Sequence, residues 1–307
     1  MVSKGEQGGL PAMVSMEDYR SDAENQWCPG CPNFAILKAL KTAFVELTKR
    51  PEELCLVSGI GQAAKLPHYL KCNFFNGLHG RALPVATAIS VVNPELTTIV
   101  VTGDGDCYGE GGNHFLHAFR RNPNITLIVH NNQIYGLTKG QASPTTDLGD
   151  RTRLQFEGVA LQPLQPLAVA ILQGCPFVAR GFAGDIAHLT ELLKEAIRFN
   201  GFSYVDVIQP CITWGTHPVT WYKERIYRLP EEYDPSQKEV ALQKAAEWGD
   251  RIPTGVIYRA ATPPRVFGEY FRTNIYEGTL TGLGFPPQRV IADLLAGFGT
   301  VKMHEKE

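Results

Sequence analysis

Acidic and amide side chains follow two apolar runs of the chain, and their chemistry suits a metal ion. One run ends in GDGD at residues 103–106 and the next ends in NNQI at residues 131–134. In an open parallel sheet, ligands bind beyond the carboxyl ends of the strands, so both segments would face one site. Asp104, the Asn132 amide and the backbone carbonyl of Ile134 are oxygen donors of the kind that Mg²⁺ combines with phosphate oxygens. The two segments therefore predict a magnesium and diphosphate site.

Glycines surround this predicted site. Gly103 and Gly105 permit a tight turn, and Gly109, Gly111 and Gly112 would let backbone N–H groups approach an anion ahead of the next helix. An ordinary turn between a strand and a helix explains the Gly-Asp-Gly triplet equally well. The triplet alone therefore leaves both interpretations open.

The composition argues against some classes of function. The chain has 307 residues, a formal net charge of -2 and a sequence pI near 6.5, and it lacks a basic run that would gather nucleic-acid phosphates. It has neither the pattern of an export signal nor the roughly 18 apolar residues of a membrane span. We expect a cytoplasmic protein that binds neither nucleic acid nor membrane. In that compartment the seven cysteines are expected to be thiols or metal ligands rather than disulfides.

Apolar runs of strand length alternate with runs of helical period along the chain, which is typical of a parallel sheet covered by helices. We expect an α/β fold with a mostly parallel sheet and helices on both faces. The expected strands are 54–60, 98–102, 125–130, 177–181 and 203–209, and the expected helices are 36–47, 83–92, 114–121, 185–199 and 237–248.

Three parts are expected along the chain. Residues 1–26 are predicted to form an extended or partly disordered N-terminal arm, and residues 27–214 to form the main domain. Residues 138–166, rich in Gly, Pro, Thr and Gln, are expected to be a long functional loop within that domain. Residues 215–307 show no new sheet pattern and are predicted to be a C-terminal arm that packs on the domain or on a neighbouring subunit.

The spacing of the two polar segments has a counterpart among known proteins. GDG followed by 25 residues and then NN resembles the signature of thiamine-diphosphate-binding proteins. Four further segments narrow the resemblance: WCPGC at 27–31, SGIG at 58–61, LHGRA at 78–82 and YGLTKGQ at 135–141. In this order, over roughly residues 25–215, they resemble the β subunit of 2-oxoacid:ferredoxin oxidoreductases.

The resemblance implies a thiamine-diphosphate-binding fold in which Asp104, Asn132 and the Ile134 carbonyl ligate Mg²⁺. It also implies an iron–sulfur cluster of the 4Fe–4S type, coenzyme A as acyl acceptor, and transfer of electrons to ferredoxin during oxidative decarboxylation of a 2-oxoacid. The positions implied to bind cofactor are Gly61, His79, Gly103, Asp104, Gly105, Asp106, Asn132, Ile134, Gly136 and Leu137.

Four residues are implied to serve the substrate or the reaction. Lys65, in the KLPH segment, is similar to the family lysine that meets the substrate carboxylate. His79 and Arg81 would lie near the cofactor or substrate, and Lys139 is a further substrate-site residue on the loop. Outside these motifs, the lysines and the arginine would be surface charges and His79 a structural histidine.

The cysteines match the family only in part. Cys28, Cys31 and Cys211 match three ligands of the implied cluster, but Gln62 stands where the family has its remaining cysteine. A glutamine amide is a poor ligand for iron in such a site, which prefers soft thiolates. The fourth ligand is therefore unknown.

Several outcomes remain open for this site. The cluster could have three thiolates and an unusual or missing fourth ligand, or Cys72 or Cys107 could replace the missing one, whereas Cys55 is expected to be buried in a strand. The site could also lack a cluster, or the CxxC segment could bind zinc or do redox chemistry.

Catalysis would also require a partner. Thiamine enzymes use a glutamate next to the aminopyrimidine, and the sequence offers no convincing candidate. The resemblance implies that a separate α subunit supplies it, so that the cofactor lies at a subunit interface and the isolated chain is nearly inactive. A non-oxidative decarboxylase or carboligase subunit, and a cofactor-binding scaffold subunit, are the alternatives, and the identity of the 2-oxoacid is not determined.

Overall fold

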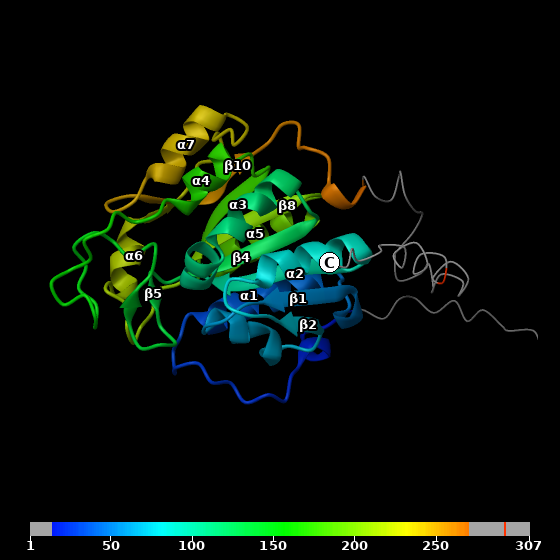
Figure 1. The fold of residues 1–307 in the computed structure, drawn as a ribbon, viewed down its shortest axis with the longest axis horizontal. Coiled ribbons are helices and arrows are strands. Elements are labelled where there is room, and N and C mark those ends of the chain that lie inside the picture. The colour runs from blue at the N-terminus through cyan, green and yellow to red at the C-terminus, as the bar shows by residue number, and fades with distance from the viewer. Residues whose placement is uncertain (1–13, 270–291, 293–307) are drawn as a thin grey trace, which may run out of the picture.

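The computed structural model describes residues 14–269 and 292. Its centre is an eight-stranded sheet with the order β2-β1-β3-β4-β8-β7-β10-β9 (Figure 1). All neighbouring pairs are parallel except β10 and β7. The strands are β1 Leu54–Ser58, β2 Asn73–Asn76, β3 Thr97–Gly103, β4 Ile125–Asn131, β7 Phe177–Phe182, β8 Phe202–Ile208, β9 Ile226–Arg228 and β10 Ile252–Arg259, and a small hairpin pairs β5 Ile134–Tyr135 with β6 Gln141–Ala142.

Helices cover both faces of the sheet (Figure 1). One core cluster contains side chains of α1 and α5, and the other contains side chains of α2, α3, α4 and α7. The helices are α1 Asn33–Glu46, α2 Ala82–Val92, α3 Gly112–Arg121, α4 Pro166–Leu172, α5 Ile186–Arg198, α6 Val219–Arg225 and α7 Lys238–Ala246. Short 3₁₀ turns are η1 Met16–Tyr19, η2 Pro51–Glu53 and η3 Ala63–Tyr69, and η4 Gly105–Glu110 is a π-helical turn.

The two-sided core explains why the strands read as unbroken apolar runs. Leu56 of β1 belongs to the cluster with α1 and α5, whereas its neighbour Val57 belongs to the cluster on the opposite face. Val101 and Val100 of β3 divide in the same way. Because both faces are buried, the central strands carry mainly apolar side chains on both sides, and their few polar side chains are buried. The predicted α/β class with a mostly parallel sheet is confirmed.

The chain beyond Trp214 differs from the expectation of no further sheet. β9 and β10 extend the sheet at one edge, and β10 pairs antiparallel with β7. The pattern was hard to recognise because Pro253 and Gly255 interrupt β10 and the register shifts between Val256 and Tyr258. The predicted helix 237–248 is present as α7, which packs in the same core cluster as α4.

The described part of the N-terminal segment is attached to the domain. Tyr19 is fully buried, and its ring lies 5.5 Å from that of Phe44 in α1. Its hydroxyl donates a hydrogen bond to the carbonyl of Lys49. Residues 1–13 and, in the predicted C-terminal arm, residues 270–291 and 293–307 lie outside the described residues, so the domain limits remain predictions.

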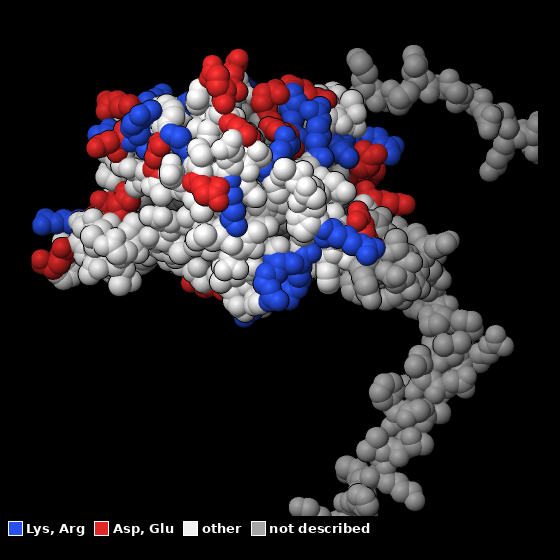
Figure 2. Space-filling model, turned by 90° about the horizontal axis from the view of Figure 1, so that it is seen from above, with Lys and Arg blue, Asp and Glu red and all other residues white. Residues whose placement is uncertain are grey.

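No helix in the described ranges has both the length and the apolar composition needed to cross a membrane. On the face shown in Figure 2, acidic and basic groups lie close to one another around an area without charged side chains. That face therefore carries a mixed charge pattern.

Candidate functional site

A cavity lies at the carboxyl ends of β3 and β4, which are adjacent in the sheet. Its volume is about 110 Å³. The cavity is lined by every residue predicted to bind cofactor: Gly61, His79, Gly103, Asp104, Gly105, Asp106, Asn132, Ile134, Gly136 and Leu137. The GDGD and NNQI segments thus face one another, as expected for the ends of neighbouring parallel strands.

The later glycines lie beside the cavity rather than in its lining, and their expected role toward an anion stays a prediction. Gly109, Gly111 and Gly112 are absent from the lining of this cavity. Gly80 allows close packing of the backbone against Glu110 and Gly111, because a Cβ on Gly80 would lie 2.5 Å from the Gly111 nitrogen and 2.4 Å from the Glu110 carbonyl carbon. Gly80 also has a φ of +70°, which favours glycine. The contact holds the His79 turn against the segment after β3.

Asp104 follows β3 and is only 1 % exposed. Burial raises the pKa of its carboxyl to about 6, against the opposing effect of hydrogen bonds from Ser143, Thr145 and the Asn132 backbone. The Thr145 hydroxyl donates to Oδ2 of Asp104 at 2.8 Å. A bound divalent cation would favour the ionised carboxylate. This buried oxygen donor at a cavity wall fits the magnesium ligand expected from sequence.

The segment carrying Asn132 and Ile134 turns sharply at Gln133, which has a left-handed φ of +56°. Several contacts hold this unfavourable conformation. The Thr146 hydroxyl donates to the Gln133 carbonyl at 2.6 Å, and the Tyr222 hydroxyl donates to its side-chain oxygen at 2.7 Å. A non-glycine residue persists in this region only when its surroundings fix it, which is common at functional sites. These supporting roles of Gln133, Thr146 and Tyr222 were not expected from sequence, because they depend on contacts between segments that lie far apart in the chain.

Asp106 joins three segments of the cavity wall. Its side chain is almost completely buried and accepts hydrogen bonds from the backbone N–H groups of Gly80 at 2.7 Å and Ile60 at 3.1 Å. The Thr102 hydroxyl donates to it at 2.5 Å, and Nδ1 of His79 lies 2.8 Å from Oδ1. One carboxylate thus aligns the turn after β1, the His79 turn and the end of β3.

The predicted charged substrate residues lie outside the lining of this cavity. Lys65 lies in η3 and is half-buried, and Lys139 is exposed on the loop. Arg81 is exposed, and its guanidinium lies 2.7 Å from Nε2 of His114. Of the predicted catalytic residues, His79 alone lines the cavity, and the roles of all four remain predictions.

The three predicted cluster cysteines share one region. Burial raises the pKa of the Cys31 thiol to about 11, and the sulfur atoms of Cys211 and Cys28 are near enough to raise it further. The sulfur of Cys211 would lie 3.9 Å from a Cβ on Gly136, which lines the cofactor cavity. The region of the thiols therefore borders that cavity.

Gln62 takes part in the same region. Its carbonyl accepts a hydrogen bond from the Trp27 indole at 2.7 Å, which brings it beside the WCPGC segment. Its side-chain oxygen is buried and has no hydrogen-bond partner. The three thiols are donors of the kind that an iron–sulfur cluster needs, and Gln62 offers only an amide at the remaining position.

The other cysteines lie elsewhere in the fold. Cys107 and Cys175 are buried in the core cluster of α2 and α3, and Cys72 packs at the edge of the opposite core. Burial raises the pKa of the Cys72 thiol to about 12. Cys55 is buried, as expected. Among the cysteines, Cys211 and Cys28 raise the pKa of the Cys31 thiol, and these four do not contribute.

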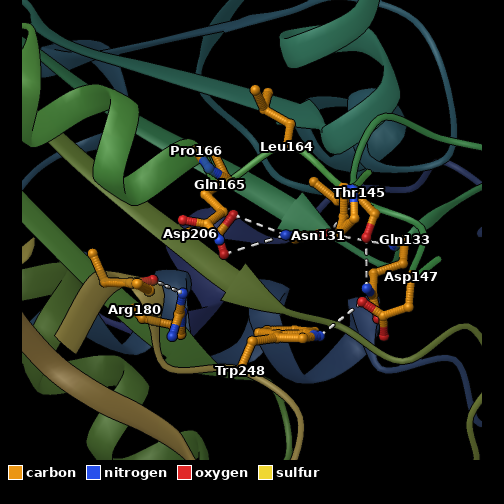
Figure 3. A pocket seen from close by; sticks show the side chains of 13 residues that line it. Asn131, Gln133, Thr145, Asp147, Leu164, Gln165, Pro166, Arg180, Asp206 and Trp248 are labelled. Carbon is orange, nitrogen blue, oxygen red and sulfur yellow. Dashed lines mark hydrogen bonds between the residues drawn. The ribbon is translucent and has the colours of Figure 1, made fainter. Parts of the chain in front are cut away.

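A second cavity of about 170 Å³ is shown in Figure 3, and two of its lining residues, Asn131 and Gln133, alternate along the chain with Asn132 and Ile134 of the first cavity. Its lining includes the polar side chains of Asn131, Gln133, Thr145, Arg180 and Asp206. The Asn131 amide donates to both carboxylate oxygens of Asp206 at 3.3 Å. The first side chain of the NNQI segment is therefore held by hydrogen bonds to a buried carboxylate.

Comparisons with known proteins agree with this geometry. The family described as thiamine pyrophosphate enzyme, C-terminal TPP binding domain, matches residues 58–207, and the family described as the C terminal of the pyruvate ferredoxin oxidoreductase beta subunit matches residues 211–276. A 2-oxoacid:ferredoxin oxidoreductase subunit beta of Saccharolobus solfataricus is 45% identical over 249 residues, covering 76% of this chain and 82% of that protein.

Two more relatives extend the comparison. A 2-oxoglutarate synthase subunit KorB of Methanocaldococcus jannaschii is 34% identical, covering 80% of this chain and 89% of that protein. A solved 2-oxoglutarate:ferredoxin oxidoreductase of Magnetococcus marinus, with 2-oxoglutarate, coenzyme A and succinyl-CoA bound, is 33% identical. It superimposes with a TM-score of 0.83, covering 91% of this chain and 95% of that chain. The chain therefore belongs to the family of 2-oxoacid:ferredoxin oxidoreductase β subunits.

Proposed function

We propose that this chain binds thiamine diphosphate and Mg²⁺ and serves the coenzyme A-dependent oxidative decarboxylation of a 2-oxoacid, with ferredoxin as electron acceptor. The observation that carries the proposal is that all residues implied to bind cofactor line one cavity at the ends of β3 and β4. Family membership supports the reaction class, because relatives are named for 2-oxoacids, 2-oxoglutarate and ferredoxin.

The metal would be held by the Asp104 carboxylate, the Asn132 amide and the Ile134 carbonyl. Such oxygen donors leave room for the phosphate oxygens that Mg²⁺ also binds. When bound, thiamine diphosphate supplies a carbanion that adds to the 2-oxo carbon and an electron sink for the bond that releases carbon dioxide. Asp106 keeps the Ile60 and Gly80 backbone in place around this cofactor. Lys65 is proposed to bind the substrate carboxylate, with His79, Arg81 and Lys139 nearby.

Cys28, Cys31 and Cys211 are proposed to hold an iron–sulfur cluster, which is suited to passing single electrons to ferredoxin. Residue 62 is a glutamine, which has no sulfur, so it cannot supply the fourth thiolate. A non-oxidative thiamine enzyme needs no cluster, so Gln62 favours that function as a second candidate.

An α subunit is proposed to complete the active site. A cavity of about 110 Å³ is small beside the roughly 300–1,000 Å³ of ordinary ligand pockets. No glutamate lines it among residues 14–269. A partner that covers the cavity would enclose the rest of the cofactor and supply the missing carboxylate. The free cysteines fit a reducing, cytoplasmic compartment, which is part of the proposal.

Two measurements on the anaerobically purified complex test these points. Calorimetry should detect Mg²⁺-dependent binding of thiamine diphosphate that Asp104→Ala abolishes and that the exposed control Asp22→Ala retains. Unchanged affinity in Asp104→Ala would contradict the site assignment.

Electron paramagnetic resonance should then detect a reduced-cluster signal after addition of 2-oxoacid and coenzyme A, and Cys28→Ala should remove it. Bound thiamine diphosphate without iron in this chain would favour the non-oxidative or scaffold function. Turnover lost in Asp104→Ala with assembly intact would argue against a scaffold.

A further inference from the structure

The Thr145 hydroxyl lies between the predicted magnesium ligand and a buried amide. It is 2.8 Å from Oδ2 of Asp104 and 3.0 Å from Oδ1 of Asn131. Ser143 Oγ lies 3.2 Å from the same hydroxyl. Thr145 is 4 % exposed and Asn131 is 6 % exposed, so solvent has little access to these contacts. The single hydroxyl hydrogen can bond to either acceptor, and removal of the hydroxyl would take one donor from this buried set, which is costly in a dry environment.

The amide of Asn131 is itself oriented by a charge network. Its Nδ2 donates to both oxygens of Asp206 at 3.3 Å, so its Oδ1 is directed toward Thr145. Asp206 is 1 % exposed and also accepts hydrogen bonds from the hydroxyls of Tyr108 at 2.7 Å and Tyr204 at 3.3 Å. A carboxylate surrounded by fixed donors holds the amide in one orientation. The hydrogen bonds to Asp206 therefore fix the direction of Asn131 Oδ1, the acceptor that faces Thr145.

Thr145 also belongs to a turn that fixes the other metal ligands. Its backbone carbonyl accepts a hydrogen bond from the Gln133 side chain at 2.6 Å. The next residue, Thr146, binds the Gln133 carbonyl, and its hydroxyl accepts from the Ser143 N–H at 2.8 Å. Gln133 lies between Asn132 and Ile134. The turn therefore contacts both walls of the predicted metal site.

We propose that Thr145 is a positioning residue for Mg²⁺: its hydroxyl fixes the Asp104 carboxylate in the orientation that ligates the metal, while its carbonyl fixes the turn that carries Asn132 and Ile134. The inference rests on the proposed function. Groups that hydrogen-bond to a metal-ligating carboxylate set its direction, and their loss typically costs 10–100-fold in metal affinity. Thr145 would not contact the metal, the cofactor or the substrate.

The test measures the Mg²⁺ concentration that half-saturates thiamine diphosphate binding, by calorimetry on the complex with its partner subunit. Thr145→Val removes the hydroxyl at nearly constant volume and should weaken Mg²⁺ binding about 10–100-fold. Thr145→Ser keeps the hydroxyl and should restore binding close to that of the wild type. The control Thr126→Val removes a buried hydroxyl near the opposite end of β4 and should leave Mg²⁺ affinity unchanged.

The outcomes separate this inference from the proposed function. Wild-type Mg²⁺ affinity in Thr145→Val, or an equal loss in Thr126→Val, would overturn the role of Thr145 while the proposed function stands. Failure of the wild type to bind thiamine diphosphate in any Mg²⁺-dependent way would overturn both. If Thr145→Val does not fold, Thr145→Ala provides the same comparison with Thr145→Ser, because it also removes only the side-chain contacts.

Discussion

Gly59 lies where the turn after β1 meets the buried Asp106 carboxylate, so one added methyl group tests how that contact supports the cavity. A Cβ at this position would lie 2.0 Å from Oδ2 of Asp106, whereas real Cβ contacts essentially never fall below 3.0 Å. The carboxylate must therefore shift by at least 1.0 Å, the difference between these two distances.

A shift of that size disturbs the hydrogen bonds that Asp106 accepts. The bonds from the Thr102 hydroxyl and the Gly80 N–H measure 2.5 and 2.7 Å, and an extra 1.0 Å takes them beyond ordinary hydrogen-bond distance. Hydrogen bonds to charged groups contribute about 1.5–3 kcal/mol each, and overpacking costs about 1–3 kcal/mol. We expect Gly59→Ala to lower the free energy of unfolding by about 2–5 kcal/mol.

Scanning calorimetry of the purified protein measures this effect, and a melting temperature lowered by roughly 5–15 °C is expected for a chain of this size. Gly112→Ala is the matched control, because a Cβ there meets nothing within 4 Å. In an Asp106→Ala background the added methyl should cost far less, since the atoms with which it collides are gone. If Gly59→Ala is as stable as Gly112→Ala, the assignment of Asp106 as the support of the cavity is wrong.

Three further predictions concern other parts of the chain. Lys65→Ala should raise KM for the 2-oxoacid far more than KM for coenzyme A in steady-state assays, and equal effects would remove Lys65 from the substrate site. Asp185→Ala should destabilise the protein by about 1–2 kcal/mol in urea titrations at neutral pH, because its carboxylate caps α5 and binds Arg228. Burial acts to raise the pKa of Asp185, but hydrogen bonds from Arg228 and the His188 N–H outweigh it and lower the pKa. The ionised carboxylate is therefore the stabilising form, and the difference between Asp185→Ala and wild type should shrink as pH falls below the usual value of 3.8 and through the lowered pKa. Tyr19→Ala should lower the free energy of unfolding by about 3–5 kcal/mol, because the ring is fully buried. Tyr19→Phe should lower it far less, because the hydroxyl makes one hydrogen bond to a backbone carbonyl. An equal loss in both variants would show that the hydroxyl dominates.

The central strands and the cofactor cavity could be predicted because their signals are local. Each strand buried on both faces is a short apolar run, and the polar residues that follow it must lie at the same edge of the sheet. That reasoning places Asp104 and Asn132 together on sequence grounds alone, and one cavity contains both.

The missed features depend on contacts between distant segments. β10 is difficult to recognise because Pro253 and Gly255 interrupt its pattern, and its partner β7 lies some seventy residues earlier in the chain. Thr145 and Tyr222 gave no individual signal, since a threonine or tyrosine in a polar segment has many possible partners. Tyr19 lay in a segment whose average composition is polar, and one fully buried ring is enough to attach it.

The π-helical turn Gly105–Glu110 lets two neighbouring groups of side chains face in different directions. Asp104 and Asp106 must face the cavity, while Phe115 and Phe119 of α3 must face the core. In a regular α-helix each residue advances the direction of its side chain by about 100°. The wider turn, in which the Gly111 N–H bonds to the Asp106 carbonyl, changes that phase between the two groups. The number of residues in this segment therefore cannot change by even one without altering that phase. A one-residue deletion there would rotate either the carboxylates out of the cavity or the phenylalanines out of the core, although no residue that contacts cofactor had been replaced.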